Sequence, residues 1–156
     1  MRLSSRQDVA AAADQVFGLL ADFPVWERAA LRRGAEVTRD DLVSAPGPGM
    51  EWRVRFDWRG RRRDAVLRLE RMEAPSHLAF SFVSVLFEGT VTVDIFEMAA
   101  RRSRIHVIAE VKPRTLASRL MLQSLRLTRN KVERRFDSRI GDLAANVESR
   151  LKGRHA

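Results

Sequence analysis

The sequence contains neither cysteine nor tyrosine among its 156 residues. Without cysteine, the chain can form no disulfide, use no thiol nucleophile and hold no cysteine-ligated zinc. Without tyrosine, it lacks one common proton donor. The G-x-S-x-G pattern of serine hydrolases and the glycine loop of phosphate-binding proteins are also missing. These absences exclude several large classes of enzyme before any residue is assigned a role.

Long apolar runs are missing as well. No uninterrupted stretch approaches the ~20 residues that span a bilayer. The first residues, MRLSSRQDV, lack the apolar segment of a secretory signal. Apolar residues nevertheless make up 45% of the chain, which is enough for a packed core. Together with the length, these features predict one soluble, cytoplasmic domain over residues 1–156.

The net charge of +9 is concentrated in the C-terminal third of the chain. Residues 112–156 hold 12 of the 29 Lys and Arg residues but only 4 of the 20 Asp and Glu residues. Such an excess lies either on a solvated helix face or against an anionic surface such as lipid or RNA. We prefer the solvated face and keep peripheral membrane contact as an alternative. The oligomeric state stays open.

Hydrophobic periodicity predicts the order of the secondary structure. Residues 1–9 suit a strand, residues 10–23 have the i, i+3/i+4 spacing of a helix, and Pro24 begins a second short helix. A strand is expected over residues 35–44, followed by the loop APGPG. Further strands joined by short turns continue to Pro113, so the sheet should be mainly antiparallel.

The segment EWRVRFDWRGRRR, residues 51–63, alternates aromatic and basic side chains. It could form a nucleic-acid platform, in which bases stack on aromatic rings among basic groups. It could also form a β-hairpin that turns at Gly60. A strand period of two puts Trp52, Phe56 and Trp58 on one face and the arginines before Gly60 on the other. We therefore favour the hairpin and assign no nucleic-acid partner.

The apolar face of this hairpin continues into neighbouring strands. If Trp58 pairs across the turn with Arg61 or Arg63, the face extends to Leu67. The segment over residues 77–85 has the same alternation and adds two aromatic residues to an apolar face, Phe80 and Phe82. The aromatic side chains of the three strands should therefore gather on one side of the sheet.

The C-terminal part, residues 116–152, has the pattern of one long amphipathic helix that Thr115 can cap and Gly153 can end. Its apolar stripe includes Phe136 and Ile140. A sheet with one apolar face needs a cover, and this helix has the length to provide it. The predicted fold is α+β, a curved antiparallel sheet of about six or seven strands around a long C-terminal helix, with two short helices after the first strand.

Two segments carry a resemblance to a known family: DVAAAADQVFGLLADFPVWERA near the start and RLMLQSLRLTRNKVERRFDSRIGDLAANVE near the end. The first contains an "aDf..w" pattern formed by Ala21, Asp22, Phe23 and Trp26. The chain resembles the START-like, or SRPBCC, superfamily and, more narrowly, its bacterial polyketide-cyclase/dehydrase-like branch. The resemblance implies a helix-grip fold with an apolar cavity between sheet and terminal helix. It also implies a lipid, polyketide or aromatic metabolite as the ligand, and in some members cyclisation or hydrolysis.

The resemblance supplies no catalytic motif, and we assign no catalytic residue, cofactor or metal ligand. The expected ligand-binding residues are apolar side chains of the strands and of the terminal helix: Trp52, Phe56, Trp58, Leu67, Phe80, Phe82, Phe136 and Ile140. The leading hypothesis is binding of a small hydrophobic molecule without catalysis. The alternatives are a polyketide cyclase or dehydratase that uses the same cavity and, third in order, an anionic-surface binder that uses the basic C-terminal helix.

An enzyme of this kind would need a convergent polar pair inside the cavity. His106 with Asp94 or Glu110 could form one, because these residues interrupt apolar strands. We favour an outward position for all three. Residues 88–89 are expected in a turn, and His77 is expected in another. The histidines are scattered and predict no metal site: His77, His106 and His155.

Overall fold

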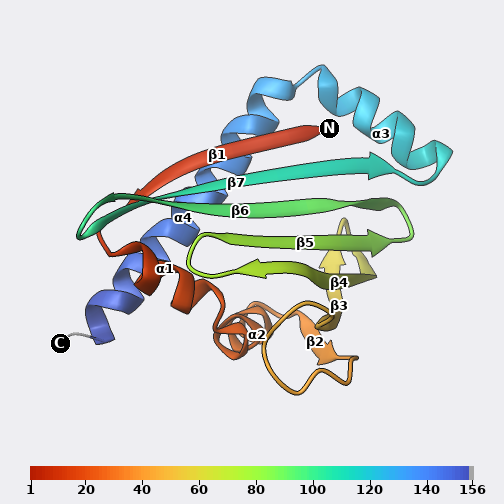
Figure 1. The fold of residues 1–156 in the computed structure, drawn as a ribbon. Helices are drawn as coiled ribbons and strands as arrows, with labels where there is room; N and C mark the ends of the chain where they lie inside the picture. Colours follow the sequence, from red (N-terminus) through yellow and green to blue (C-terminus); the bar gives the residue numbers. More distant parts are fainter. Residues whose placement is uncertain (155–156) are drawn as a thin grey trace.

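The structure, a computed structural model, describes residues 1–154 and is built on one antiparallel sheet (Figure 1). The sheet order is β1-β7-β6-β5-β4-β3-β2, so only the pair β1–β7 joins strands that are distant in sequence. The antiparallel sheet of seven strands confirms the predicted architecture. The strands are β1 (Arg2–Val9), β2 (Glu36–Arg39), β3 (Glu51–Trp58), β4 (Arg61–Glu73), β5 (His77–Ser84), β6 (Phe87–Ala99) and β7 (Arg102–Pro113).

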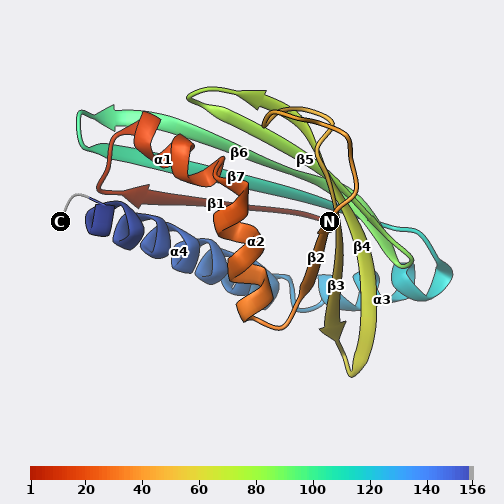
Figure 2. The ribbon, with the colours of Figure 1, turned by 90° about the horizontal axis from the view of Figure 1, so that it is seen from below.

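The helices lie on one side of the sheet, except α3, which stands at its end. Figure 2 shows α1, α2 and α4 gathered on that side and the β3–β4 hairpin curving toward them. Two short helices follow the first strand, as predicted. The helices of the described residues are α1 (Ala13–Leu20), α2 (Phe23–Arg32), α3 (Leu116–Arg126) and α4 (Arg129–Arg154).

The prediction of one continuous helix over residues 116–152 is wrong. The helical pattern is split by a turn at Leu127 and Thr128, and α3 and α4 run in different directions (Figure 1). The Thr128 hydroxyl donates to a carbonyl at the end of α3, and the Thr128 carbonyl accepts the first amide hydrogen bonds of α4. A threonine that binds the local backbone in this way competes with helix continuation. The apolar spacing alone does not reveal the break.

The longer helix, α4, is attached to the edge of the sheet. It packs along β1 and against α1. Asp137 accepts hydrogen bonds from the Ser5 hydroxyl at 2.5 Å and from Gln7 Nε2 at 3.0 Å, and both donors lie on β1. Val147 and Leu151 of α4 are buried in the core that the inner face of the sheet forms with the helices. The terminal helix therefore covers the β1 side of the sheet and leaves the β3–β5 side to other elements.

The β3–β4 hairpin has the register that the sequence predicts. Trp58 pairs with Arg61 across a two-residue turn. Both turn residues, Arg59 and Gly60, have positive φ, at 51° and 73°. A turn of this kind matches the right-handed twist of the strands it joins. The register places Leu67 opposite Trp52, so the predicted apolar face of the hairpin is present.

Residues 88–89 lie within β6, and the prediction of a turn there is wrong. A Cβ atom on Gly89 would lie 1.9 Å from the carbonyl oxygen of Glu110 and 2.7 Å from the Phe82 ring. Glycine is therefore required by the close approach of a neighbouring strand and an aromatic ring. In a sequence, glycine usually indicates a turn. The close contacts that explain Gly89 are visible only in the folded structure.

The segment between β2 and β3 is a loop, since β2 ends at Arg39 and is shorter than the strand predicted over residues 35–44. Asp41 organises this loop by accepting backbone hydrogen bonds from Val43 at 2.9 Å and from Glu51 at 2.8 Å. Across residues 1–154, no helix has both the length and the apolarity needed to cross a membrane.

Candidate ligand-binding site

An apolar cavity of about 290 Å³, called here the main cavity, lies between the inner face of the sheet and the helices. Its size is close to the lower limit for small-molecule sites. The sheet wall is made mostly by side chains of β3, β4 and β5, namely Trp52, Val54, Leu67, Leu78 and Phe80. The opposite wall comes from α1, α2 and α4, namely Leu20, Phe23, Trp26, Ala30 and Leu143.

Most of the helical wall belongs to α2, whose sequence places apolar side chains on one face. Phe23, Trp26 and Ala30 recur at steps of three and four residues, which aligns them along a helix. The Trp26 indole donates to the Leu19 carbonyl at 3.0 Å, which fixes the ring at the wall. The Phe23 ring lies 5.2 Å from Trp52, so helix and sheet meet through aromatic contacts.

Glu27 is the one titratable side chain among the residues that line the main cavity. Its carboxylate accepts a hydrogen bond of 2.8 Å from the Trp52 indole. Glu27 is not among the predicted site residues, although its position four residues after Phe23 puts it on the same helix face. A single carboxylate with one donor can orient a ligand hydroxyl, but it forms no acid–base pair by itself.

The β2–β3 loop is held beside the main cavity by a paired arginine. The Arg39 guanidinium lies 5.9 Å from the centre of the Trp52 ring and binds both carboxylate oxygens of Asp41, at 2.7 and 2.6 Å. Arg39, together with the amides of Glu51 and Val43, holds the pKa of Asp41 well below its usual range. Asp41 therefore stays ionised at neutral pH and keeps its hydrogen bonds to Arg39 and to the loop amides.

A second pocket of about 410 Å³, called here the hairpin pocket, lies on the same face at the turn end of β3 and β4. No helix residue lines it among the described residues. The Trp58 and Phe87 rings meet there edge to face, with centres 6.2 Å apart. Its other apolar lining residues are Phe56, Ala65, Phe82, Val85, Leu86 and Val111.

The side chains that the sequence predicts around one cavity are distributed over both pockets. Trp52, Leu67 and Phe80 line the main cavity. Three further aromatic residues line the hairpin pocket instead: Phe56, Trp58 and Phe82. All six side chains lie on the predicted face of the sheet. The position of the helices determines which of them line the same cavity.

Phe136 and Ile140 line neither pocket, which departs from the prediction. Both side chains are half-buried and pack against the core cluster. The reason is the position of α4 along β1, which turns this part of its apolar stripe away from β3 and β4. Leu143, further along the same helix, is the residue of α4 that reaches the main cavity.

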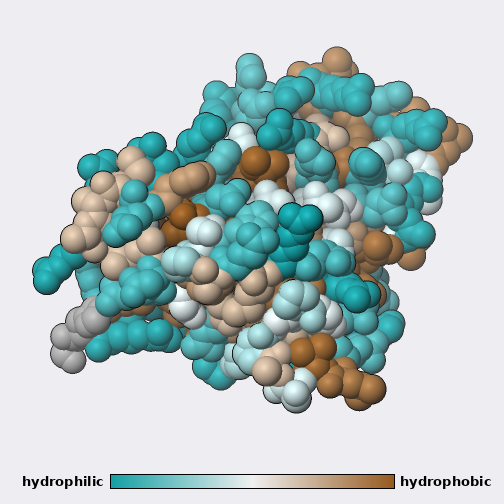
Figure 3. Space-filling model, viewed as in Figure 1, coloured by the Kyte–Doolittle hydropathy of each residue, from teal (hydrophilic) through white to brown (hydrophobic). Residues whose placement is uncertain are grey.

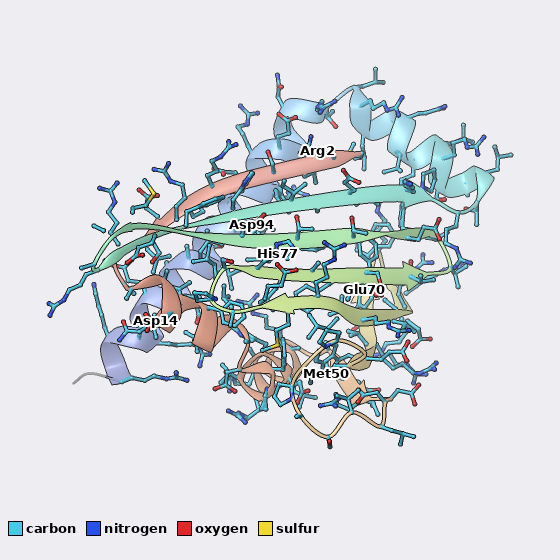
Figure 4. All side chains as sticks on the ribbon, viewed as in Figure 1. Arg2, Asp14, Met50, Glu70, His77 and Asp94 are labelled. Carbon is cyan, nitrogen blue, oxygen red and sulfur yellow. The ribbon has the colours of Figure 1, made fainter. Side chains whose placement is uncertain are left out.

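The polar residues considered for catalysis lie on the outer face of the sheet. His106 is opposite Asp94 in the strand register, and both alternate with buried residues of the inner face. Figure 4 shows His77 and Asp94 side by side on the face away from α4, where His77 Nδ1 is 2.7 Å from Asp94 Oδ1. Burial, with a contribution from Arg6, lowers the pKa of His106. None of these residues lines either pocket.

The structure corrects the prediction for His77 and does not describe His155. His77 was expected in a turn, but it is the first residue of β5 and contacts the Asp94 carboxylate. His155 lies outside the described residues. Within residues 1–154, no group of three or more His, Asp or Glu side chains could hold a metal ion.

A curved antiparallel sheet that packs against a long C-terminal helix, with an apolar cavity between the sheet and the helices, defines a helix-grip protein of the START-like class. The chain belongs to the family described as polyketide cyclase / dehydrase and lipid transport, whose model matches residues 1–148. This membership agrees with the resemblance found in the sequence. No curated protein matches the chain.

Several solved structures have the same fold. The Zhui aromatase/cyclase of a Streptomyces species has a TM-score of 0.69 at 18% identity, over 97% of this chain and 95% of that one. The protein TTHA0849 of Thermus thermophilus also has a TM-score of 0.69, at 11% identity over the whole of both chains. A START superfamily protein of Mycobacterium smegmatis has a TM-score of 0.56 at 14% identity, over 86% of this chain and 95% of that one. At these identities the likeness shows the fold alone.

Proposed function

We propose that the protein binds a small hydrophobic molecule in the main cavity and that binding, without catalysis, is its function. The observation that carries this proposal is the lining of the cavity, in which a single carboxylate, Glu27, stands among apolar side chains. Apolar surface gains about 25 cal/mol per Å² when it leaves water, so such a wall favours an apolar guest.

The shape of the lining suggests the class of ligand. Aromatic rings from α2, β3 and β5 surround the space, with Phe23 in contact with both Trp52 and Phe80. Rings at these positions accept either an alkyl chain or a flat aromatic guest. The Glu27 carboxylate can accept a hydrogen bond from a hydroxyl group of the guest. We therefore propose a lipid, a polyketide or an aromatic metabolite that carries a hydroxyl group.

A cyclase or dehydratase that uses the same cavity is the alternative. Its support is the family description and the fold shared with an aromatase/cyclase. Glu27 would then be the acid or base, because it is the one titratable side chain lining the main cavity. The two proposals differ in the fate of the bound molecule. A binding protein returns it unchanged, and an enzyme converts it.

Contact with an anionic membrane is a third proposal, favoured by one surface feature. A leucine stripe is exposed along α3 and the turn that follows it, with Leu116 in the helix and Leu127 in the turn exposed by 72% and 88%. Arg119 and Arg126 flank it, and Figure 3 shows apolar side chains among polar ones over α3. Exposed leucines with neighbouring arginines are typical of helices that lie on lipid surfaces. This contact would be peripheral and would deliver or collect the ligand.

The test of the leading proposal uses a variant that fills the cavity. Ala30→Phe places a ring in the main cavity, while Ala29→Phe adds the same ring on the same helix at a residue that does not line it. Fatty alcohols, sterols and uncharged aromatic polyketides are screened by thermal shift against both variants and the natural chain. Bound molecules are then extracted with organic solvent and identified by mass spectrometry.

We expect at least one compound to raise the melting temperature of the natural chain and of Ala29→Phe but not of Ala30→Phe. A ligand at a hundredfold excess over its dissociation constant stabilises the fold by about 2.7 kcal/mol, which is easily measured. Binding that survives in Ala30→Phe, or the absence of any binder, contradicts the proposal. Recovery of a converted product favours the cyclase alternative.

A further inference from the structure

The hairpin pocket differs from the main cavity in containing an arginine without a polar partner. Arg63 lies on β4 opposite Phe56, so its side chain belongs to the inner face of the sheet. Its Nε–H group is buried and has no hydrogen-bond acceptor among residues 1–154. Its guanidinium carbon lies 5.5 Å from the centre of the Trp58 ring, which is in range for a cation–π contact.

A buried donor without an acceptor is unusual. A polar group that is removed from water and left without a hydrogen bond costs about 1–3 kcal/mol, and charged groups cost more. The Trp58 ring offers its π face to the guanidinium but no lone pair for the Nε–H group. The pocket therefore offers a buried, unpaired donor on a positively charged group, which a negatively charged hydrogen-bond acceptor would satisfy.

The other charged side chains around the pocket already have partners. Arg62 forms ion pairs with Glu36 at 3.1 Å and with Asp57 at 3.2 Å. Asp64 is paired with Arg55 at 3.0 Å on the outer face of the sheet. Among the charged residues that line the hairpin pocket, Arg63 alone forms no ion pair within the described part of the chain.

We propose that the hairpin pocket binds a small apolar molecule that carries one carboxylate, and that Arg63 pairs with this carboxylate. The apolar part would lie among the aromatic rings of Phe56, Trp58 and Phe82, in a pocket of about 410 Å³. A guanidinium presents its donors in a planar fork that fits a carboxylate. One arginine matches one negative charge, whereas a doubly charged phosphate would stay partly uncompensated.

This site stands apart from the main cavity and does not depend on the proposed function. The two pockets share no lining residue, and their tryptophans differ. Trp26 and Trp52 line the main cavity, whereas Trp58 lines the hairpin pocket. Because these are the three tryptophans of the chain, each indole N–H signal in a nitrogen-15 NMR spectrum reports on one known pocket.

The experiment titrates the labelled protein with decanoate and with decanol, which have the same chain length but differ in charge. Arg63→Gln removes the proposed partner of the carboxylate. Arg68→Gln removes the same charge from the same strand, on a side chain that lines neither pocket. Arg63→Lys keeps the charge but loses the planar fork. Trp58→Phe assigns the Trp58 signal, and circular dichroism confirms that each variant is folded.

Decanoate should shift the Trp58 signal of the natural chain in a saturable manner, and decanol should bind there at least tenfold more weakly. Arg63→Gln should weaken decanoate binding by about 10- to 100-fold, as loss of a charge-assisted hydrogen bond does. Arg63→Lys should fall between these values, and Arg68→Gln should match the natural chain. Binding of decanol should be the same in all three arginine variants.

The proposal is overturned if decanoate leaves the Trp58 signal unchanged. It is also overturned if decanol shifts the Trp58 signal with the same affinity as decanoate, or if Arg63→Gln binds decanoate as tightly as the natural chain does. Failure of the proposed function has a different signature, because it leaves the Trp26 and Trp52 signals unmoved by every apolar compound. The two proposals can therefore fail separately.

Discussion

The two pockets lie on the same face of one sheet but differ in what covers them. At the main cavity, α1, α2 and Leu143 of α4 face the sheet, and Trp52 is only 4% exposed. At the hairpin pocket no helix residue of the described range 1–154 takes part, and two arginines, Arg59 and Arg63, lie over the Trp58 ring. Similar strand patterns thus give an apolar cavity that helices cover and a second, mostly apolar pocket that contains an unpaired arginine.

The largest effect is expected from a core residue next to the covered end. Leu69→Ala should lower the free energy of unfolding by about 2–5 kcal/mol, since Leu69 has 0% exposure and its loss leaves a void. Phe56→Ala should cost clearly less, because the Phe56 ring is only half-buried and lines a pocket to which no described helix contributes. Denaturant unfolding measures both. Equal losses would mean that the hairpin end is as closed as the core.

A second test concerns the boundary of the hairpin pocket. Gly89→Ala should destabilise the protein by about 3 kcal/mol, because the added methyl group overlaps the Glu110 carbonyl and pushes the Phe82 ring out of place. Thermal unfolding measures the loss. A variant as stable as the natural chain would show that β6 and β7 are further apart than the structure places them.

Acid should weaken the loop beside the main cavity. Because the pKa of Asp41 in the folded protein lies below its ordinary value of 3.8, its ionised form stabilises the fold above about pH 4. This contribution disappears as the pH falls below that value. Asp41→Asn should therefore be less stable at pH 7 and lose less stability on acidification than the natural chain.

The matched control for this pH test is Asp57→Asn at the hairpin end, where the carboxylate is 75% exposed. Exposed ion pairs contribute little, so this variant should keep the acid-unfolding profile of the natural chain. Unfolding monitored by circular dichroism between pH 7 and pH 2 compares the three proteins. An unchanged profile for Asp41→Asn would contradict the assigned role of the loop.

The smallest effect is expected at a glycine of α4. A Cβ atom on Gly141 would meet the Gln7 side chain at 3.6 Å, an ordinary contact. Gly141→Ala should therefore stabilise the protein by up to about 1 kcal/mol, since alanine favours the helix. Thermal unfolding should therefore show a gain in stability for Gly141→Ala and a loss for Gly89→Ala. This difference separates a glycine that a close strand contact requires from one that an alanine can replace.

The sequence predicts the strands better than it predicts which side chains line a common cavity. A period of two gave the correct face for Trp52, Phe80 and the other aromatic residues, and Gly60 gave the hairpin register. Local patterns carry this information because strand neighbours are close in sequence. The wall from α2, the role of Glu27 and the crowding at Gly89 depend on contacts between distant segments, which single-sequence periodicity does not contain.

The position of α4 shows the same limit. Its apolar stripe was predicted, but the stripe does not say which strands it meets. Hydrogen bonds from Ser5 and Gln7 to Asp137 tie the helix to β1, so Phe136 and Ile140 pack beside the core without lining a pocket. The break at Thr128 further separates α3 from α4. Both features arise from polar contacts that an analysis of apolar spacing ignores.

The central claim is that an uncharged apolar molecule enters the main cavity. The most direct measurement follows the indole N–H signals of the three tryptophans while the natural chain and Ala30→Phe are titrated with fatty alcohols, sterols and aromatic polyketides. The account predicts saturable shifts of Trp26 and Trp52 in the natural chain, no matching shift of Trp58, and loss of the effect in Ala30→Phe. Signals of Trp26 and Trp52 that no compound moves, or that move equally in Ala30→Phe, would contradict it.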